Sequence, residues 1–207
     1  MSYGYSSDEQ WHNDIYHSVF EYARMKHKGQ FRKDGVEEYI NHPFRVSQIV
    51  RHHGGSIEQQ CAALLHDVVE DTDTSLEQLE SDVFRILVGL FTPDDVVSQE
   101  SRWMAEKIAK YVNDLTCKYT PKAYPNLNRA KRKELELAEF LKLADEGSKV
   151  IKFADIIDNL SSIEKLDPAF AEKYLFEDFR IIRALKIDHP IYQRVVEVFK
   201  EAVGKML

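Results

Sequence analysis

The chain has 207 residues, of which 43% are hydrophobic and 30% are charged, a composition typical of one soluble globular domain. Its formal net charge of −7 argues against a nucleic-acid-binding surface, which would be basic. No apolar stretch approaches the ~20 residues of a membrane helix, the start of the chain lacks the features of a signal peptide, and two cysteines cannot build a disulfide framework. We therefore expect a cytoplasmic protein that binds neither membranes nor nucleic acid.

Helical periodicity extends over nearly the whole chain, and no segment alternates as a strand would. The sequence predicts helices over 10–28, 43–54, 56–70 and 74–89, a loop or irregular segment over 92–101, a helix from there to 114, and a long loop over 115–127. Further helices are expected over 128–144, 148–165, 167–184 and 188–207. Gly29 is a natural helix stop, and Ser56 with Gln59 forms a capping box. We predict an all-α fold of eight or nine helices in one compact domain over residues 1–207, with a core over about 10–165 and C-terminal helices over 167–206.

The segment Ala62–Asp71 combines a histidine and three acids with apolar neighbours. On a helix, His66 and Glu70 share one side, as do Asp67 and Asp71, because each pair is four residues apart. His66 and Asp67 are adjacent, so both can reach one ion only at the edge or end of a helix. Burying these groups is costly unless something compensates, and a divalent cation would do so. The alternative is an amphipathic helix with a solvated acidic end.

Two further segments carry candidate ligands. In Lys152–Leu160, Asp155 and Asn159 are four residues apart in an otherwise apolar stretch, which indicates that the acid has a partner. That partner is an ion or a protein, or else a nearby Lys or Arg. His42 precedes Pro43 at a predicted junction between a loop and a helix, where it is either a well-placed ligand or a structural histidine.

Together the three segments favour a metal centre. They supply two imidazoles and two carboxylates: His42, His66, Asp67 and Asp155. Mixed nitrogen and oxygen ligation suits Mn²⁺, Fe²⁺ or Zn²⁺ better than Ca²⁺ or a thiolate site. Such an ion lowers the pKa of bound water, so the pattern indicates a hydrolase that works near neutral pH.

The order of these segments resembles the HD phosphohydrolase superfamily and, more closely, the hydrolase domain of the RelA/SpoT family and its stand-alone small alarmone hydrolases. The similarity covers about residues 10–200. It lies in Arg32–Pro43, Ala62–Asp71 and Lys152–Leu160, which are similar to the family patterns RKxG…YIxHP, ALLHDxxED and KLADxxxNL. The resemblance implies hydrolysis of the 3′-pyrophosphate of guanosine tetra- or pentaphosphate to GDP or GTP and pyrophosphate.

The resemblance also implies roles for individual residues. The metal, typically Mn²⁺, would be bound by His42, His66, Asp67 and Asp155. Glu70 and Asp71 would position or deprotonate the attacking water. The nucleotide would be bound by Arg32, Lys33, Asn159 and Ser162.

The chain departs from the family pattern at positions that concern the substrate. It has one more residue between Arg32 and His42, in the segment Val36–Glu38, and Ile156 and Ser161 replace basic residues that the family usually has. Two alternatives therefore stay open. One is an HD phosphohydrolase that acts on another phosphorylated nucleotide, such as NADPH, and the other is a non-catalytic module that binds a nucleotide or a partner protein.

Other features have plain interpretations. The basic run Arg129–Lys133 is either a solvated helical turn paired with the glutamates that follow or a cationic lid over the substrate phosphates. The apolar C-terminal helix is either buried in the domain or covered in a homodimer. Four histidines are expected at the surface: His12, His17, His27 and His189.

Overall fold

The computed structural model describes residues 7–90, 95–163 and 168–206, and over this part of the chain the regular structure is helical. The helices are α1 Ser7–Lys26, α2 Asn41–His52, α3 Ile57–Leu65, α4 Val68–Asp71, α5 Leu76–Gly89, α6 Asp95–Leu115, α7 Arg129–Leu143, α8 Glu146–Leu160, α9 Pro168–Ala184 and α10 Pro190–Met206. One isolated bridge joins Phe31 to Glu38 in the loop between α1 and α2. The predicted all-α class is confirmed.

Local signals placed several helix ends correctly. Ser56 and Gln59 form the predicted capping box at the start of α3, because the serine hydroxyl and the glutamine side chain each satisfy a free backbone N–H. The chain turns after α1 at Gly29, whose φ of 81° is accessible to glycine at low cost.

Three predicted boundaries are wrong. The helix expected over 56–70 is split into α3 and α4. The irregular segment expected up to residue 101 is helical from Asp95 onward, because α6 packs along α5 and tertiary packing supports a helix that the local sequence only weakly favours. The cap of α8 is Asp145 rather than Ser148, since the Asp145 carboxylate accepts the backbone N–H of Ser148. The predicted helix end at residue 165 and the predicted cap at 167 lie outside the described residues.

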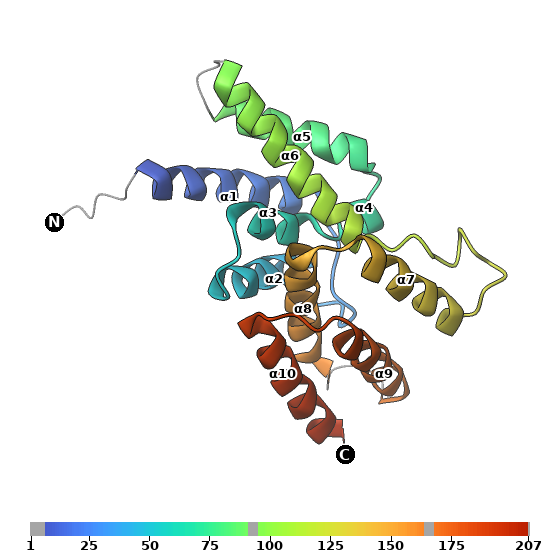
Figure 1. Ribbon diagram of the computed structural model, residues 1–207. Helices are drawn as coiled ribbons and strands as arrows, with labels where there is room; N and C mark the ends of the chain where they lie inside the picture. Colours follow the sequence, from blue (N-terminus) through green and yellow to red (C-terminus); the bar gives the residue numbers. More distant parts are fainter. Residues whose placement is uncertain (1–6, 91–94, 164–167, 207) are drawn as a thin grey trace.

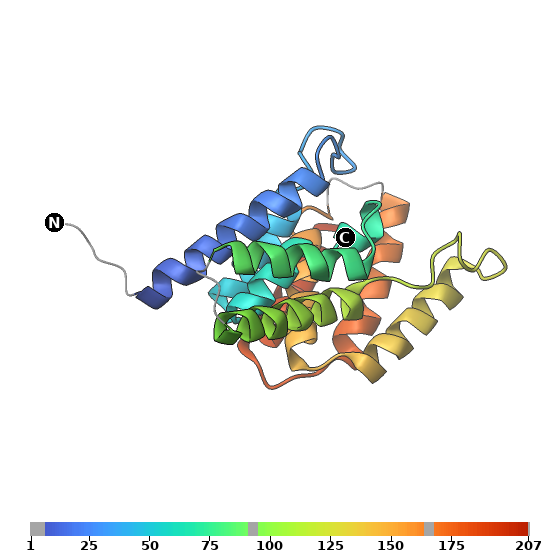
Figure 2. The same cartoon turned by 90° about the horizontal axis from the view of Figure 1, so that it is seen from above.

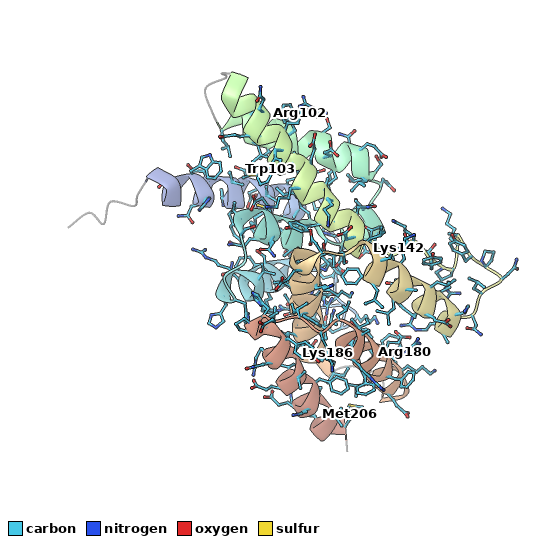
Figure 3. All side chains as sticks on the ribbon, viewed as in Figure 1. Arg102, Trp103, Lys142, Arg180, Lys186 and Met206 are labelled. Atoms are coloured by element: carbon cyan, nitrogen blue, oxygen red, sulfur yellow. The ribbon has the colours of Figure 1, made fainter. Side chains whose placement is uncertain are left out.

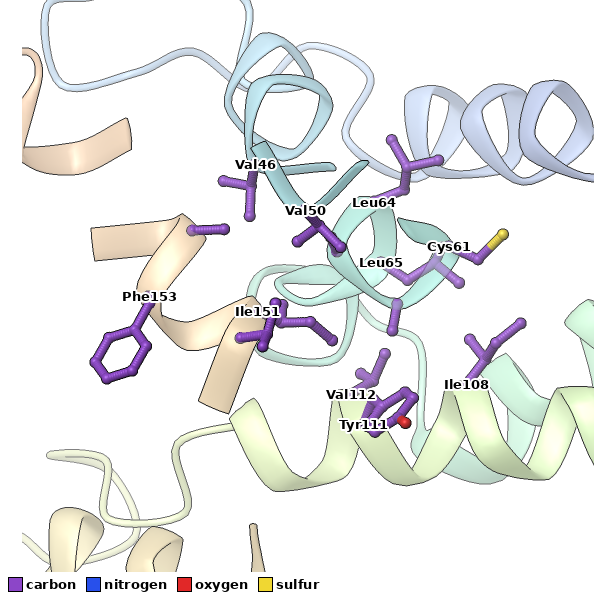
Figure 4. Close-up of a cluster of buried hydrophobic side chains, with 14 of the residues drawn as sticks. Val46, Val50, Cys61, Leu64, Leu65, Ile108, Tyr111, Val112, Ile151 and Phe153 are labelled. Atoms are coloured by element: carbon purple, nitrogen blue, oxygen red, sulfur yellow. The ribbon is translucent and has the colours of Figure 1, made fainter. Parts of the chain in front are cut away.

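The core is centred on α3, which contacts α1, α2, α6 and α8. All five residues of Cys61–Leu65 have no exposed surface, so the second half of this helix is apolar on every side, as a segment at the centre of a core must be. Figure 4 shows side chains of four helices converging there. They are Val46 and Val50 of α2, Cys61, Leu64 and Leu65 of α3, Ile108, Tyr111 and Val112 of α6, and Ile151 and Phe153 of α8.

The remaining helices surround this centre. In both ribbon views α7 and the loop before it lie at the edge of the molecule (Figures 1 and 2), and none of the residues of α7 is buried. Charged side chains such as Arg102, Lys142 and Arg180 lie on the outside of the bundle (Figure 3). Within the described residues no helix is both long and apolar enough to cross a membrane.

The C-terminal helix is part of the domain. It packs against α8 and α9, and its buried residues are Ile191, Val195, Val198 and Ala202. This burial accounts for its apolar face without a partner chain, and the homodimer stays a prediction.

Candidate metal centre

The site forms where α3 ends. His66 and Asp67 occupy the two-residue break between α3 and α4, and Asp67 has backbone angles of φ −99° and ψ −5°. This break places the adjacent side chains at a helix end, where both can face one point. Leu64 and Leu65, both fully buried, anchor the preceding turn in the core.

The four predicted ligands come together in space. His42, His66 and Asp67 each offer one ligand atom within 4.8 Å of the others. His42 Nε2 lies 3.7 Å from Asp67 Oδ2 and 3.3 Å from Asp155 Oδ1. His66 Nε2 lies 3.0 Å from Asp67 Oδ2 and 3.9 Å from Asp155 Oδ1. Three segments that are far apart in the sequence therefore contribute to one cluster.

The histidine nitrogens are arranged as a metal site requires. His66 Nδ1 contacts the carbonyl oxygen of Ala63 at 2.8 Å, and His42 Nδ1 contacts Asp158 Oδ2 at 2.7 Å. Both Nε2 atoms are thereby directed toward the carboxylates, and within the described part of the chain no hydrogen bond satisfies the buried His66 Nε2. A ligand histidine typically uses one ring nitrogen for the ion and the other for a fixed acceptor, so these residues fit a divalent cation.

Electrostatics also favour a cation at this point. Burial would raise the pKa of Asp67, but the His66 and His42 rings beside it hold that pKa well below its usual value. Burial would lower the pKa of His66, but the Asp67 carboxylate raises it to about 9. The cluster therefore stabilises positive charge, whether that charge is a proton or a metal ion.

Asp155 has the basic partner that the sequence left as one alternative, and the ion stays a prediction. Its Oδ2 accepts a hydrogen bond from Lys152 Nζ at 3.0 Å, and its Oδ1 accepts one from Asn159 Nδ2 at 2.6 Å. The same Oδ1 faces the two histidines. Lys152 compensates for the burial of the acid and, with the histidines, holds the Asp155 pKa well below its ordinary value.

An open pocket of about 400 Å³ lies over the cluster, and both predicted catalytic acids line it. Glu70 is exposed at the pocket rim and accepts a hydrogen bond from the backbone N–H of Cys117. The protein around its carboxylate removes water, which raises the pKa of Glu70 to about 7. Desolvation and the Asp67 charge raise the pKa of Asp71 as well. Glu70 is therefore suited to exchange a proton near neutral pH.

The four predicted nucleotide contacts line the same pocket: Arg32, Lys33, Asn159 and Ser162. Arg32 Nη2 donates to Asn159 Oδ1 at 2.8 Å. Lys33 Nζ lies 3.8 Å from the centre of the Phe170 ring, a cation–π contact. Neither position where the family pattern loses a basic residue lines this pocket, because Ile156 is buried in the core and the Ser161 hydroxyl donates to the carbonyl of Ile157.

Sequence reasoning missed several residues of the pocket. Tyr39 donates to Asp67 Oδ2 at 2.7 Å, and Lys133, Lys152 and Tyr174 are also in the lining. Tyr39 precedes His42 by three residues and Lys152 precedes Asp155 by three residues, both within the family patterns. This closeness to a predicted ligand is the signal that could have identified them. Lys133 of α7 belongs to the basic run for which a cationic lid was one alternative, whereas nothing in the local sequence of Tyr174 of α9 connects it to the site.

Two other sequence interpretations can be compared with the structure. Lys131 and Lys133 pair with Glu134 and Glu136 as the solvated-turn alternative predicts, whereas Arg129 pairs with Glu177 of α9. His12 and His17 are exposed and His189 is half-buried. The expectation that His27 lies at the surface is wrong.

His27 is only 2% exposed, because the loop after α1 folds back over it. Its ring lies against Tyr39, and its Nδ1 is 2.7 Å from the Gln30 side-chain oxygen.

An all-helical domain that joins a His–Asp pair to a second histidine and a distant aspartate defines the HD class of proteins. The HD domain family profile matches residues 19–175, more than half of the chain, and the chain belongs to this family.

Curated relatives and a solved structure agree with this assignment. The chain is 30% identical over 162 residues to the Mus musculus guanosine-3′,5′-bis(diphosphate) 3′-pyrophosphohydrolase MESH1, which spans 77% of this chain and 75% of that protein. The chain is also 33% identical over 151 residues to the Drosophila melanogaster protein of the same name, a match that spans 72% of this chain and 69% of that protein. A structure described as a metazoan ortholog of SpoT that hydrolyzes ppGpp matches with a TM-score of 0.69 at 23% identity, over 97% of this chain and 98% of that one. At 23% identity, this structural match shows a shared fold.

Proposed function

We propose that the chain is a metal-dependent hydrolase that removes the 3′-pyrophosphate of guanosine tetra- or pentaphosphate, yielding pyrophosphate and GDP or GTP. The observation that carries the proposal is one pocket in which the His–Asp cluster, two acids and several cations face the same space. The names of the curated relatives support the same substrate.

His42, His66, Asp67 and Asp155 would hold the ion, and we propose Mn²⁺, with Fe²⁺ and Zn²⁺ as alternatives that suit the same donor set. When bound, a divalent ion supplies positive charge for phosphate oxygens and lowers the pKa of water. Tyr39 and Lys152 each donate a hydrogen bond to a ligand carboxylate, so they would keep Asp67 and Asp155 in place.

Glu70 would accept the proton of the attacking water. Its pKa of about 7 means that the ionised form is well populated at neutral pH, and the Cys117 N–H holds one carboxylate oxygen in place. Asp71 lines the pocket beside it and would orient the same water. The backbone carbonyl of Asp71 accepts a hydrogen bond from Gln30 Nε2 at 2.7 Å, which ties this turn to the loop that carries Arg32.

Arg32, Lys33, Asn159 and Ser162 would bind the nucleotide. Arg32 would present its guanidinium plane to the base, since the Arg32–Asn159 hydrogen bond orients it. Lys33, together with Lys133 and Lys152 of the same pocket lining, would neutralise phosphate charge. The absence of basic residues at positions 156 and 161 does not deplete the pocket of cations, so these two departures do not count against the alarmone as substrate.

The test is a Mn²⁺-supplemented assay of the purified chain with guanosine tetraphosphate, with products resolved by anion exchange. We expect GDP and pyrophosphate in equal amounts, and no product after chelation. NADPH serves as the comparison substrate. Release of orthophosphate, or turnover of NADPH alone, would contradict the proposal. The cytoplasmic location stays a prediction.

A further inference from the structure

A second buried acid lies behind the metal centre, on the side of His42 away from the ligand carboxylates. Asp158 is only 4% exposed, and its Oδ2 lies 2.7 Å from His42 Nδ1. The residue follows Asp155 by three positions on α8, so both acids lie on the side of the helix that faces α2. The reaction proposed above gives Asp158 no role.

Asp158 is itself held by a salt bridge with two contacts. Arg45 Nε donates to Asp158 Oδ1 at 2.6 Å, and Arg45 Nη2 donates to Oδ2 at 3.1 Å. Arg45 Nη1 donates to the carboxylate of Glu37. The acid is therefore an anion that accepts hydrogen bonds from both sides.

The two ligand histidines are oriented in different ways. His66 Nδ1 is hydrogen-bonded to Ala63 O, a carbonyl of the helix that precedes it. His42 depends instead on a side chain from another helix. If Asp158 accepts the Nδ1 proton, the Nε2 lone pair of His42 must face Asp67 and Asp155, because a neutral imidazole carries one proton.

We propose that Asp158 is a positioning residue of the metal centre: held by Arg45, which Glu37 holds in turn, it selects the His42 tautomer and ring orientation that bind the ion. The inference rests on the proposed metal centre. Glu37 lines the nucleotide pocket and belongs to the segment with one residue more than the family pattern. Contacts from Glu37 through Arg45 and Asp158 therefore connect this segment to His42.

The test measures Mn²⁺ affinity of the full chain, by electron paramagnetic resonance of free Mn²⁺, for the wild type, Asp158→Asn and Arg45→Met. We expect Asp158→Asn to weaken binding by about 10–100-fold, the usual effect of removing the acid behind a ligand histidine. Arg45→Met should shift affinity in the same direction by less, since the contact between Asp158 and His42 remains.

Two matched controls separate positioning from general damage. Glu58→Gln removes another buried acid that is paired with a cation, Lys107, and does not contact a predicted ligand. Arg194→Met removes an arginine that lines the same surface groove as Arg45 but pairs with acids of its own helix. Both should bind Mn²⁺ as the wild type does.

Each outcome has a separate meaning. A wild type that binds no Mn²⁺ refutes the metal centre itself. A wild type that binds Mn²⁺ while Asp158→Asn binds it equally well overturns only the positioning role. ¹⁵N NMR of the metal-free protein, at a pH where the imidazole is neutral, should show the Nδ1-protonated tautomer of His42 more populated in the wild type than in Asp158→Asn, because the carboxylate is the stronger acceptor. If circular dichroism shows that Asp158→Asn does not fold, Arg45→Met decides, and unchanged affinity there overturns the proposal.

Discussion

Replacing Glu70 by glutamine tests the proposed proton acceptor with little change in shape. The amide oxygen of glutamine can still accept the Cys117 N–H that Glu70 accepts, so the loop after α6 keeps its contact. Only the ability to take a proton is lost. A positioned general base contributes about 10²–10⁴-fold to rate, which corresponds to roughly 3–5 kcal/mol of the activation barrier. We expect kcat to fall by that factor while bound Mn²⁺ is retained.

The pH profile gives the second part of this test. Because the pKa of Glu70 is raised to about 7, about one-tenth of it is ionised at pH 6, half at pH 7 and nine-tenths at pH 8. The base must be ionised to act, so kcat/KM of the wild type should rise roughly tenfold from pH 6 to pH 8, and the Glu70→Gln profile should lose this rise.

The assay is steady-state pyrophosphate release at saturating Mn²⁺. Glu139→Gln is the control, because Glu139 pairs with Lys118 outside the metal pocket. A Glu70→Gln variant with the wild-type rate, or with the same rise between pH 6 and 8, would refute the reasoning.

Three further predictions concern the ion, the nucleotide and the core. Asp67→Ala should abolish both Mn²⁺ binding and turnover, and stoichiometric Mn²⁺ in that variant, measured by metal analysis after gel filtration, would refute the ligand assignment. Lys33→Ala should raise KM more than it lowers kcat, because the ammonium lies at the pocket edge over Phe170; an unaltered KM in the same steady-state assay would argue against the contact. Leu65→Ala should destabilise the fold by about 2–5 kcal/mol, because Leu65 has no exposed surface and lies in the central helix; urea unfolding that shows less than ~1 kcal/mol would mean that the core repacks around the lost side chain.

The break between α3 and α4 shows where local reasoning stops. The helical pattern continues from Ile57 to Asp71, and propensity alone joins the two segments. The structure interrupts the helix at His66 and Asp67, and the His66 ring turns back to bond the Ala63 carbonyl. Because the helix ends here, the adjacent side chains of His66 and Asp67 can face one point. The sequence indicated that such an end was needed, but it did not predict the break.

The cluster itself could be predicted because each proposed ligand stands beside a local signal: a proline after His42, an adjacent acid beside His66, and an apolar helix around Asp155. The residues that hold these side chains in place could not be predicted from the sequence. Tyr39 and Asp158 acquire their roles from contacts that span 28 and 116 residues of sequence, and such contacts leave no periodic pattern. His27 was misplaced for the same reason, since only the returning loop buries it.

The sequence by itself determined the helical class, most helix ends and the candidate ligands, because periodicity, caps and short motifs act over a few residues. Tertiary structure decided which acids share the ligands' space, which cations line the pocket, and which groups orient the histidines. These depend on how α2, α3 and α8 pack around a common core, and packing between distant segments follows from the burial of whole helices rather than from any local run of residues.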